Sequence, residues 1–188
     1  MGSWGITALQ SDIGLDAVSD IRGFFLDNRP LILSEILHFL EQDKFYAPPA
    51  EEGISHTGFL ALSEIIVTGF LDRDFSRIDL LPEEKSFSEV SYFSATKQSV
   101  QWLRDYLEQT LHSAVDNAES NAAVNKWNGW FKEENWVGWQ EHMKSVIECL
   151  DTLLTFPADP INLASDEVQA YCAVEGAGSI EDQPEMTM

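Results

Sequence analysis

Apolar residues recur every three or four positions along most of the chain, which is the spacing of one face of an α-helix. The pattern predicts helices over residues 11–27, 31–44, 55–72, 94–115 and 135–156. Pro157 and Pro160 end the last of these, because proline lacks the amide proton that an α-helix needs. We therefore expect an all-α fold, an irregular bundle of about five helices.

Two segments lack this helical spacing. Residues 72–94 contain Leu80-Leu81-Pro82 and are predicted to form a long loop. From Ala158 onwards the chain is acidic and poor in large apolar groups, so we expect a single helical domain over 1–157 and an acidic tail over 158–188. Within that tail, one short docked helix is expected at 166–174.

Local residue types leave some details of these elements open. The β-branched run Ile65-Ile66-Val67 also suits a strand near 65–70, and a strand or hairpin near 87–93 fits as well. Ser11, Ser55 and Ser94 are residue types that cap helix N-termini. Gly14 and Gly23 each weaken the first helix by about 1 kcal/mol relative to alanine, and we expect them to allow close packing.

The net charge restricts the classes of partner. The chain has 188 residues, of which 11 are basic and 32 acidic, giving a formal charge of −21. Such a chain is repelled by nucleic-acid phosphates and by anionic membranes, so we expect neither as a direct partner. With 44% hydrophobic residues it has enough apolar side chains to fold, and a basic protein is the favoured partner.

The acidic residues include a series with helical spacing. Asp12, Asp16 and Asp20 recur every four residues, and like charges at this spacing cost a few tenths of a kcal/mol per pair. Stability alone does not explain the series; it is either a solvated helix face or a carboxylate surface that meets Lys and Arg of a partner. The candidate partner-binding residues are Asp12, Asp16, Asp20, Asp72, Asp74, Glu83, Glu84, Trp130 and Trp136.

Four tryptophans, Trp127, Trp130, Trp136 and Trp139, lie close together in the sequence. Within each pair the spacing of three residues places both rings on one face of a helix. The group is either a core seam between the fourth and last helices or an exposed recognition surface, because tryptophan is enriched at binding hot spots.

The sequence offers weak signals for catalysis. Glu35 and His38 have the Glu-x-x-His spacing of a metal-binding helix, but a di-iron bundle needs two such motifs. Ser55 and His56 are adjacent, a placement that rarely gives catalytic geometry, and Cys149 lies in an apolar run typical of a buried thiol. We therefore expect no enzyme, no cofactor and no metal. The alternatives are a metal-dependent or hydrolytic enzyme using Glu35 and His38, or an acidic mimic of nucleic acid.

The cellular location is expected to be the cytoplasm. The chain has no run of about 18 apolar residues that would span a membrane, and its start lacks the basic and apolar regions of a secretory signal. Its two cysteines do not make a disulfide framework.

The start of the chain carries a resemblance. The residues Met1-Gly2-Ser3-Trp4-Gly5, followed by Ser11-Asp12 and Leu15-Asp16, resemble a family of small bacterial proteins that open with M-G-x-W-G and form a domain of unknown function. The usual Asn/Asp-Asp pair is Ser11-Asp12 here, and the match covers about the first 20 residues.

That resemblance implies a cytoplasmic bacterial protein without catalytic residues to transfer. Members of the family sometimes accompany toxin genes, which by analogy suggests an immunity role. We therefore expect an immunity-type inhibitor that occludes a basic toxin or nuclease domain. We also expect the ring of Trp4 to pack over the helical core, with the flanking glycines allowing a close approach.

Overall fold

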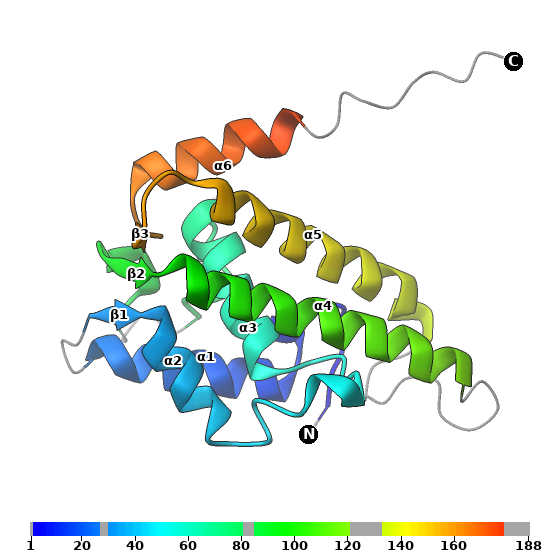
Figure 1. Ribbon diagram of the computed structural model, residues 1–188. Helices are drawn as coiled ribbons and strands as arrows, with labels where there is room; N and C mark the ends of the chain where they lie inside the picture. The colour runs from blue at the N-terminus through cyan, green and yellow to red at the C-terminus, as the bar shows by residue number, and fades with distance from the viewer. Residues whose placement is uncertain (1, 27–29, 81–84, 121–132, 179–188) are drawn as a thin grey trace, which may run out of the picture.

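The computed structural model describes residues 2–26, 30–80, 85–120 and 133–178 (Figure 1). Its α-helices are α1 (Asp12–Leu26), α2 (Leu33–Glu41), α3 (Gly58–Glu64), α4 (Lys97–Ser120), α5 (Trp136–Thr155) and α6 (Asp166–Gly178). A π-helix, η3 (Ile65–Leu71), continues α3. Single-turn 3-10 helices are η1 (Ala8–Gln10), η2 (Ala50–Glu52), η4 (Phe87–Glu89) and η5 (Glu133–Asn135).

The prediction of an all-α fold is wrong, because the helices surround a small mixed sheet. Its strands are β1 (Leu31–Ile32), β2 (Phe93–Ala95) and β3 (Ile161–Asn162), in the order β1-β2-β3. β1 runs parallel to β2, and β3 runs antiparallel to it. Strands of two or three residues are too short to show the alternation by which a strand is recognised in a sequence. Only the strand left open near 87–93 overlaps one of them, at Phe93 of β2.

Because of the sheet, α2 and α4 begin later in the sequence than expected. The segment expected as a helix over 31–44 begins as β1, and α2 starts after it. Ser94 lies within β2 and does not cap α4; the hydroxyl of Thr96 accepts from the Ser99 amide at 3.2 Å. Ser55 likewise does not cap α3, where the Thr57 hydroxyl accepts from the Leu60 amide.

The core is arranged around α3. All residues of α3 are buried. The apolar run continues into η3, so the segment near 65–70, where a strand was left open, is helical. α4 and α5 run antiparallel beside one another on one side of α3, and α1 lies on another side (Figure 1). α5 lies close to the range expected for the last helix. Within the described residues, no helix is long and apolar enough to cross a bilayer.

The segment after Pro157 packs onto this body. β3 pairs with β2, and the helix expected at 166–174 is α6, which runs on to Gly178 and buries Val168. Arg73, in a left-handed backbone conformation with φ 57°, holds α6 in place: its Nη2 donates to the Ala164 carbonyl at 2.9 Å and to Asp166 at 2.8 Å. Residues 179–188 lie outside the described part of the chain.

The described part of the segment expected as a loop over 72–94 is held by a buried arginine. Arg22 of α1 is 4% exposed and donates to the Ile78 carbonyl at 2.7 Å. Its Nη2 lies 3.6 Å from the Asp79 carboxylate, and its guanidinium lies over the Phe87 ring. Asp79 in turn accepts from the Phe87 amide at 2.8 Å. This segment is therefore fixed to α1 on both sides of residues 81–84.

The first residues of the chain pack against α1, although not through Trp4. The Trp4 side chain is 54% exposed, so the expectation that its ring covers the core is wrong. Close packing occurs at Gly14, where a β-carbon would lie 1.8 Å from the Ala8 carbonyl oxygen of η1. A β-carbon at Gly23 would meet no neighbouring segment within 4 Å, so the packing role predicted for both glycines holds for Gly14 alone.

These two glycines provide a matched test of the packing. We expect Gly14→Ala to destabilise the protein by about 1–3 kcal/mol, because the added methyl group overlaps a backbone carbonyl. We expect Gly23→Ala to stabilise it by about 0.5–1 kcal/mol, because alanine favours the helix and the space is open. Urea denaturation of the two variants measures both effects, and an equal effect of the two substitutions would contradict the packing at Gly14.

Candidate protein-binding surface

Carboxylates from two elements converge around one tyrosine at the surface of α1. Asp16 and Asp20 are exposed one helical turn apart, and the hydroxyl of Tyr46 donates to Asp20 at 2.5 Å. Burial raises the pKa of Tyr46, and the hydrogen bond to Asp20 and the charges of Asp20, Asp16 and Asp43 raise it further. Since Asp43 follows α2, the two segments together form what we call the α1 acidic surface: Asp16, Asp20 and Asp43.

Asp12, the first residue of the predicted acidic series, has a different role. Its carboxylate accepts from the Gly2 amide at 2.8 Å, and its own amide donates to the Gly2 carbonyl at 3.1 Å. Asp12 therefore ties the start of the chain to α1, and its side chain is only partly exposed.

Asp72 and Asp74 are exposed but lie apart from the α1 acidic surface, near α6. Asp72 caps the C-terminus of η3, and the next residue, Arg73, is bound to α6. Burial raises the pKa of Asp72, and the charge of Asp74 adds to this effect. Hydrogen bonds from Ser76 lower the pKa of Asp74. Asp16 and Asp20 thus belong to one group of predicted contact residues, and Asp72 and Asp74 belong to another.

The remaining predicted contact residues can be placed only in part. Glu83, Glu84 and Trp130 lie outside the described residues. Trp136 is half-buried at the start of α5, and its ring stacks on Trp139 with centroids 5.4 Å apart. Trp139 is buried. The role of Trp136 in binding stays a prediction.

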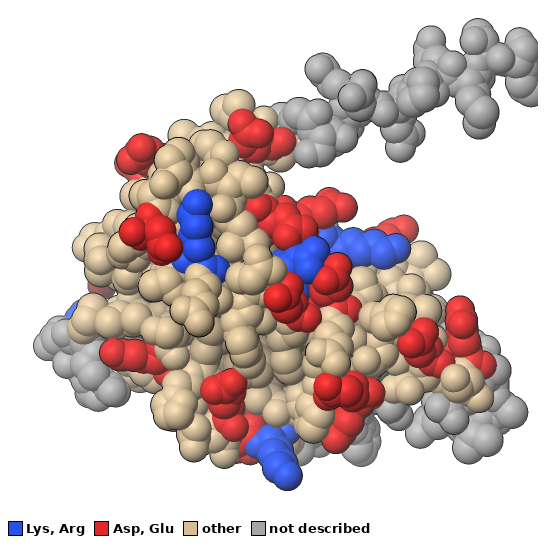
Figure 2. Space-filling view, viewed as in Figure 1, with Lys and Arg blue, Asp and Glu red and all other residues tan. Residues whose placement is uncertain are grey.

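Several basic side chains are engaged by groups of the protein itself. Arg22 of α1 is buried against the Asp79 segment, and Arg73 binds α6. Arg104 of α4 donates to Asp151 of α5 at 2.8 Å and also pairs with Glu108. Figure 2 shows acidic side chains over all parts of one face, with few basic ones between them.

Glu35 and His38 do not form a shared site. Both are exposed on α2, and the His38 Nδ1 lies 4.0 Å from the carboxylate of Glu41 rather than beside Glu35. Among the residues that the structure describes, no group of three or more His, Cys, Asp or Glu could hold a metal ion.

A buried carboxylate joins three separate segments inside the protein. Glu64 is 1% exposed at the end of α3. Its two oxygens accept from the amides of Ala8 at 2.7 Å and Leu9 at 3.0 Å, which begin η1. His142 of α5 completes the cluster, with its Nε2 2.7 Å from the Glu64 Oε1. Because the carboxylate accepts from both amides, His142 is the donor in this third bond.

A second buried pair lies beside it, at the chain before α3. Ser55 and His56 are 3% and 4% exposed. The His56 Nε2 is 3.1 Å from the Gly5 carbonyl, which can only accept, so Nδ1 accepts from the Ser55 hydroxyl at 2.8 Å. The indole of Trp139 donates to the Ser55 carbonyl at 2.7 Å. The two neighbours thus hydrogen-bond to one another, and the pair anchors the N-terminal segment.

Neither the Glu64 cluster nor the Ser55–His56 pair was predicted from the sequence. The residue that could have indicated a buried polar cluster is Glu64. A carboxylate within the apolar run Phe59–Leu71 has to find donors, because a buried unpaired charge costs several kcal/mol. The sequence does not indicate which donors, since Ala8 and His142 are far away along the chain.

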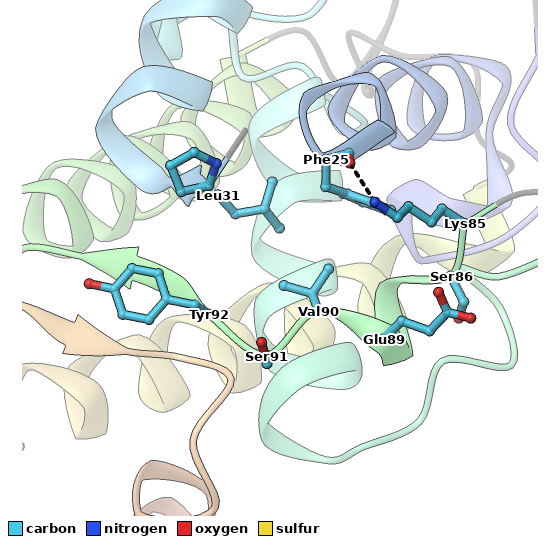
Figure 3. A pocket seen from close by; sticks show the side chains of 9 residues that line it. Phe25, Leu31, Lys85, Ser86, Glu89, Val90, Ser91 and Tyr92 are labelled. Atoms are coloured by element: carbon cyan, nitrogen blue, oxygen red, sulfur yellow. Dashed lines mark hydrogen bonds between the residues drawn. The ribbon is translucent and has the colours of Figure 1, made fainter. Parts of the chain in front are cut away.

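A small hollow opens beside β1 (Figure 3). It has a volume of about 320 Å³, and Leu31 and Val90 point toward one another across it. Lys85 donates to the Phe25 carbonyl at 3.3 Å at its edge, and the exposed ring of Tyr92 lies at the other end. The sequence pattern gives no sign of this hollow, because its walls come from three separate segments.

Comparisons with protein-family models, with curated proteins and with solved structures gave no match. The arrangement of the residues is therefore the basis for a functional proposal.

We expect the Glu64 cluster to be a major source of stability. Glu64→Gln keeps the shape but removes the charge and one acceptor, and breaking a buried pair in this way costs about 3–5 kcal/mol. A double-mutant cycle with His142→Gln should give a coupling above about 1 kcal/mol in urea denaturation. Glu141→Gln, at the exposed neighbour of His142, is the control and should change stability by less than about 0.5 kcal/mol. Additive effects at Glu64 and His142 would exclude the coupling.

We expect His56 to make the protein less stable in mild acid. Burial lowers the pKa of His56 from 6.5 to about 4, and the charge of His142 acts in the same direction. The unfolded chain therefore binds a proton below about pH 6.5 while the folded protein does not until about pH 4. Stability falls as the pH drops through this window, by about 3 kcal/mol in total.

Replacing the histidine tests this assignment. His56→Gln should lose this part of the pH dependence in urea denaturation between pH 7 and 4.5, whatever its stability at pH 7. His38→Gln, at an exposed histidine, should retain the wild-type dependence. An unchanged slope in His56→Gln would show that His56 is not the group responsible.

Proposed function

We propose that this protein is an acidic protein-binding module, and that it acts as an immunity-type inhibitor that occludes a basic toxin or nuclease domain. The observation that carries the proposal is the α1 acidic surface. Asp16 and Asp20 from α1 and Asp43 from after α2 act on the same tyrosine hydroxyl. Three carboxylates are thus gathered at one place on the exterior.

This gathering has an energetic cost that folding does not require. Like charges on successive helical turns destabilise a helix by a few tenths of a kcal/mol per pair. Tyr46 offsets part of this cost by donating to Asp20, whereas Asp16 stays exposed. A surface that is costly for the isolated protein becomes favourable when Lys or Arg side chains of a partner neutralise it.

Three arginines lie away from this surface, although Lys44 is exposed directly after Asp43. Arg22, Arg73 and Arg104 serve internal contacts, so their charges do not lie beside Asp16 and Asp43. The three carboxylates Asp16, Asp20 and Asp43 outnumber this lysine, so their field attracts a basic partner and accelerates association at low ionic strength. The resemblance of the first residues to the M-G-x-W-G family supports the inhibitory role by analogy only.

The partner can be captured directly. The purified protein, immobilised as bait in a lysate of its own source, should retain one basic protein at low salt and hold it less well at high salt, because screening weakens the attraction. Retention of an acidic protein, or binding that does not respond to salt, would contradict the electrostatic basis of the proposal.

The contact surface is tested by reversing its charges. We expect the double variant Asp16→Lys/Asp43→Lys to weaken binding of the captured protein at least about tenfold, which is about 1.4 kcal/mol. Glu141→Lys/Glu167→Lys changes the net charge equally at exposed positions of α5 and α6 and should have a much smaller effect. Isothermal titration calorimetry measures both affinities. Equal affinities of the two variants would exclude the α1 acidic surface as the contact.

A further inference from the structure

A groove lies on the surface between α5 and α6. The two helices run antiparallel and separate toward the end of α6 (Figure 1). At the closed end, the rings of Phe156 and Tyr171 meet edge to face at 5.2 Å, and the Tyr171 hydroxyl lies 3.0 Å from that of Thr155. Beyond this contact the groove has a volume of about 730 Å³, within the range of ligand sites.

The walls of the groove carry negative charge. Glu148 and Asp151 line it from α5, and Glu175 lines it from α6. No Lys, Arg or His belongs to the lining that the structure describes; the other members are two cysteines, hydroxyl-bearing residues and a glycine. Arg104 of α4 binds Asp151 at 2.8 Å and balances that carboxylate.

The two thiols in the groove are kept protonated chiefly by burial. Burial raises the pKa of Cys149, and the charges of Asp72 and Glu148 raise it further. Burial raises the pKa of Cys172 to about 11, and Cys149 and Asp72 contribute as well. The nearby carboxylates thus act on the thiol pKa values in the same direction as burial. Asp72, one of the predicted contact residues, thereby belongs to the surroundings of the groove.

We propose that the groove between α5 and α6 binds a positively charged segment of a partner protein, with its Lys or Arg side chains meeting Glu148 and Glu175. This inference rests on the proposed function and specifies a second contact, apart from the α1 acidic surface. The half-buried thiols and the methyl groups of the threonines would receive the apolar stems of those side chains, which long basic residues bury while their charges meet carboxylates.

Charge also decides between possible occupants. Residues 179–188 of this chain contain Glu181, Asp182 and Glu185 and no Lys or Arg, so the groove repels them. A second copy of the chain carries the same charge of −21. A basic segment of another protein is the occupant whose charge complements the groove.

A short cationic peptide tests the groove without knowledge of the natural partner. We expect fluorescently labelled nona-arginine to bind the wild-type protein at low salt in fluorescence anisotropy. Glu148→Gln/Glu175→Gln should weaken this binding at least about tenfold. Glu35→Gln/Glu119→Gln removes the same charge from exposed positions of α2 and of the last turn of α4, and should weaken it by less than about threefold.

The cysteines add a second, local readout, because the only two in the chain both line the groove. Complete alkylation with N-ethylmaleimide should obstruct the groove and weaken peptide binding by the wild-type protein at least about fivefold. Cys149→Ser/Cys172→Ser cannot be alkylated there, so the reagent should leave its affinity for the peptide unchanged.

The outcomes separate this inference from the proposed function. Equal weakening by the two glutamine pairs, together with no effect of alkylation, would overturn the groove as a site. If the peptide then loses affinity only in Asp16→Lys/Asp43→Lys, the basic segment lies on the α1 acidic surface and the proposed function stands. Absence of peptide binding by the wild-type protein would also overturn the groove, while capture of a basic protein remains the test of the module itself.

Discussion

The buried carboxylate of Glu64 is the interaction on which the arrangement of this protein depends. It accepts from the first amides of η1 and from His142, so one side chain joins the N-terminal segment, α3 and α5. The amides at the start of a helix have no partner within the helix, and a carboxylate placed there satisfies them while balancing its own charge. The Ser55–His56 pair holds the same N-terminal segment at Gly5, so both buried centres serve the position of α1.

The position of α1 matters because its exterior carries the acidic surface. Gly14 lets α1 approach η1, and Arg22 fixes the opposite end of the helix to the Asp79 segment. With both ends held, Asp16 and Asp20 lie beside Tyr46, which comes from the chain after α2. The protein thus uses Arg22 and Glu64 for internal order and leaves Asp16 and Asp20 exposed, which is the distribution of charge on which the proposed function rests.

The sequence predicts those parts of this structure that depend on local spacing. The spacing of apolar residues and the prolines that follow predict α5, and apolar residues also predict the short helix α6. The four-residue spacing of its aspartates predicts the acidic face of α1. Non-local partners are not predictable in this way. The contribution of Asp43 to the acidic surface depends on how α2 ends, and the donors to Glu64 come from opposite parts of the chain. The pairing of the sheet was missed for the same reason, although a strand near 87–93 was left open, because Leu31, Phe93 and Ile161 pair only when three distant segments meet.

The order of the sheet also limits when the native structure can form during synthesis. β2 lies between β1 and β3, and β3 leaves the ribosome long after the other two strands. The Phe93 carbonyl accepts from the Leu163 amide, and the Phe93 amide donates to the Asn162 side chain, so the middle strand lacks these partners in a nascent chain. Contacts this distant along the chain delay folding until the segment that completes them is made. Ribosome-bound chains that stop before Ile161 should therefore expose one edge of β2 to other proteins, including chaperones.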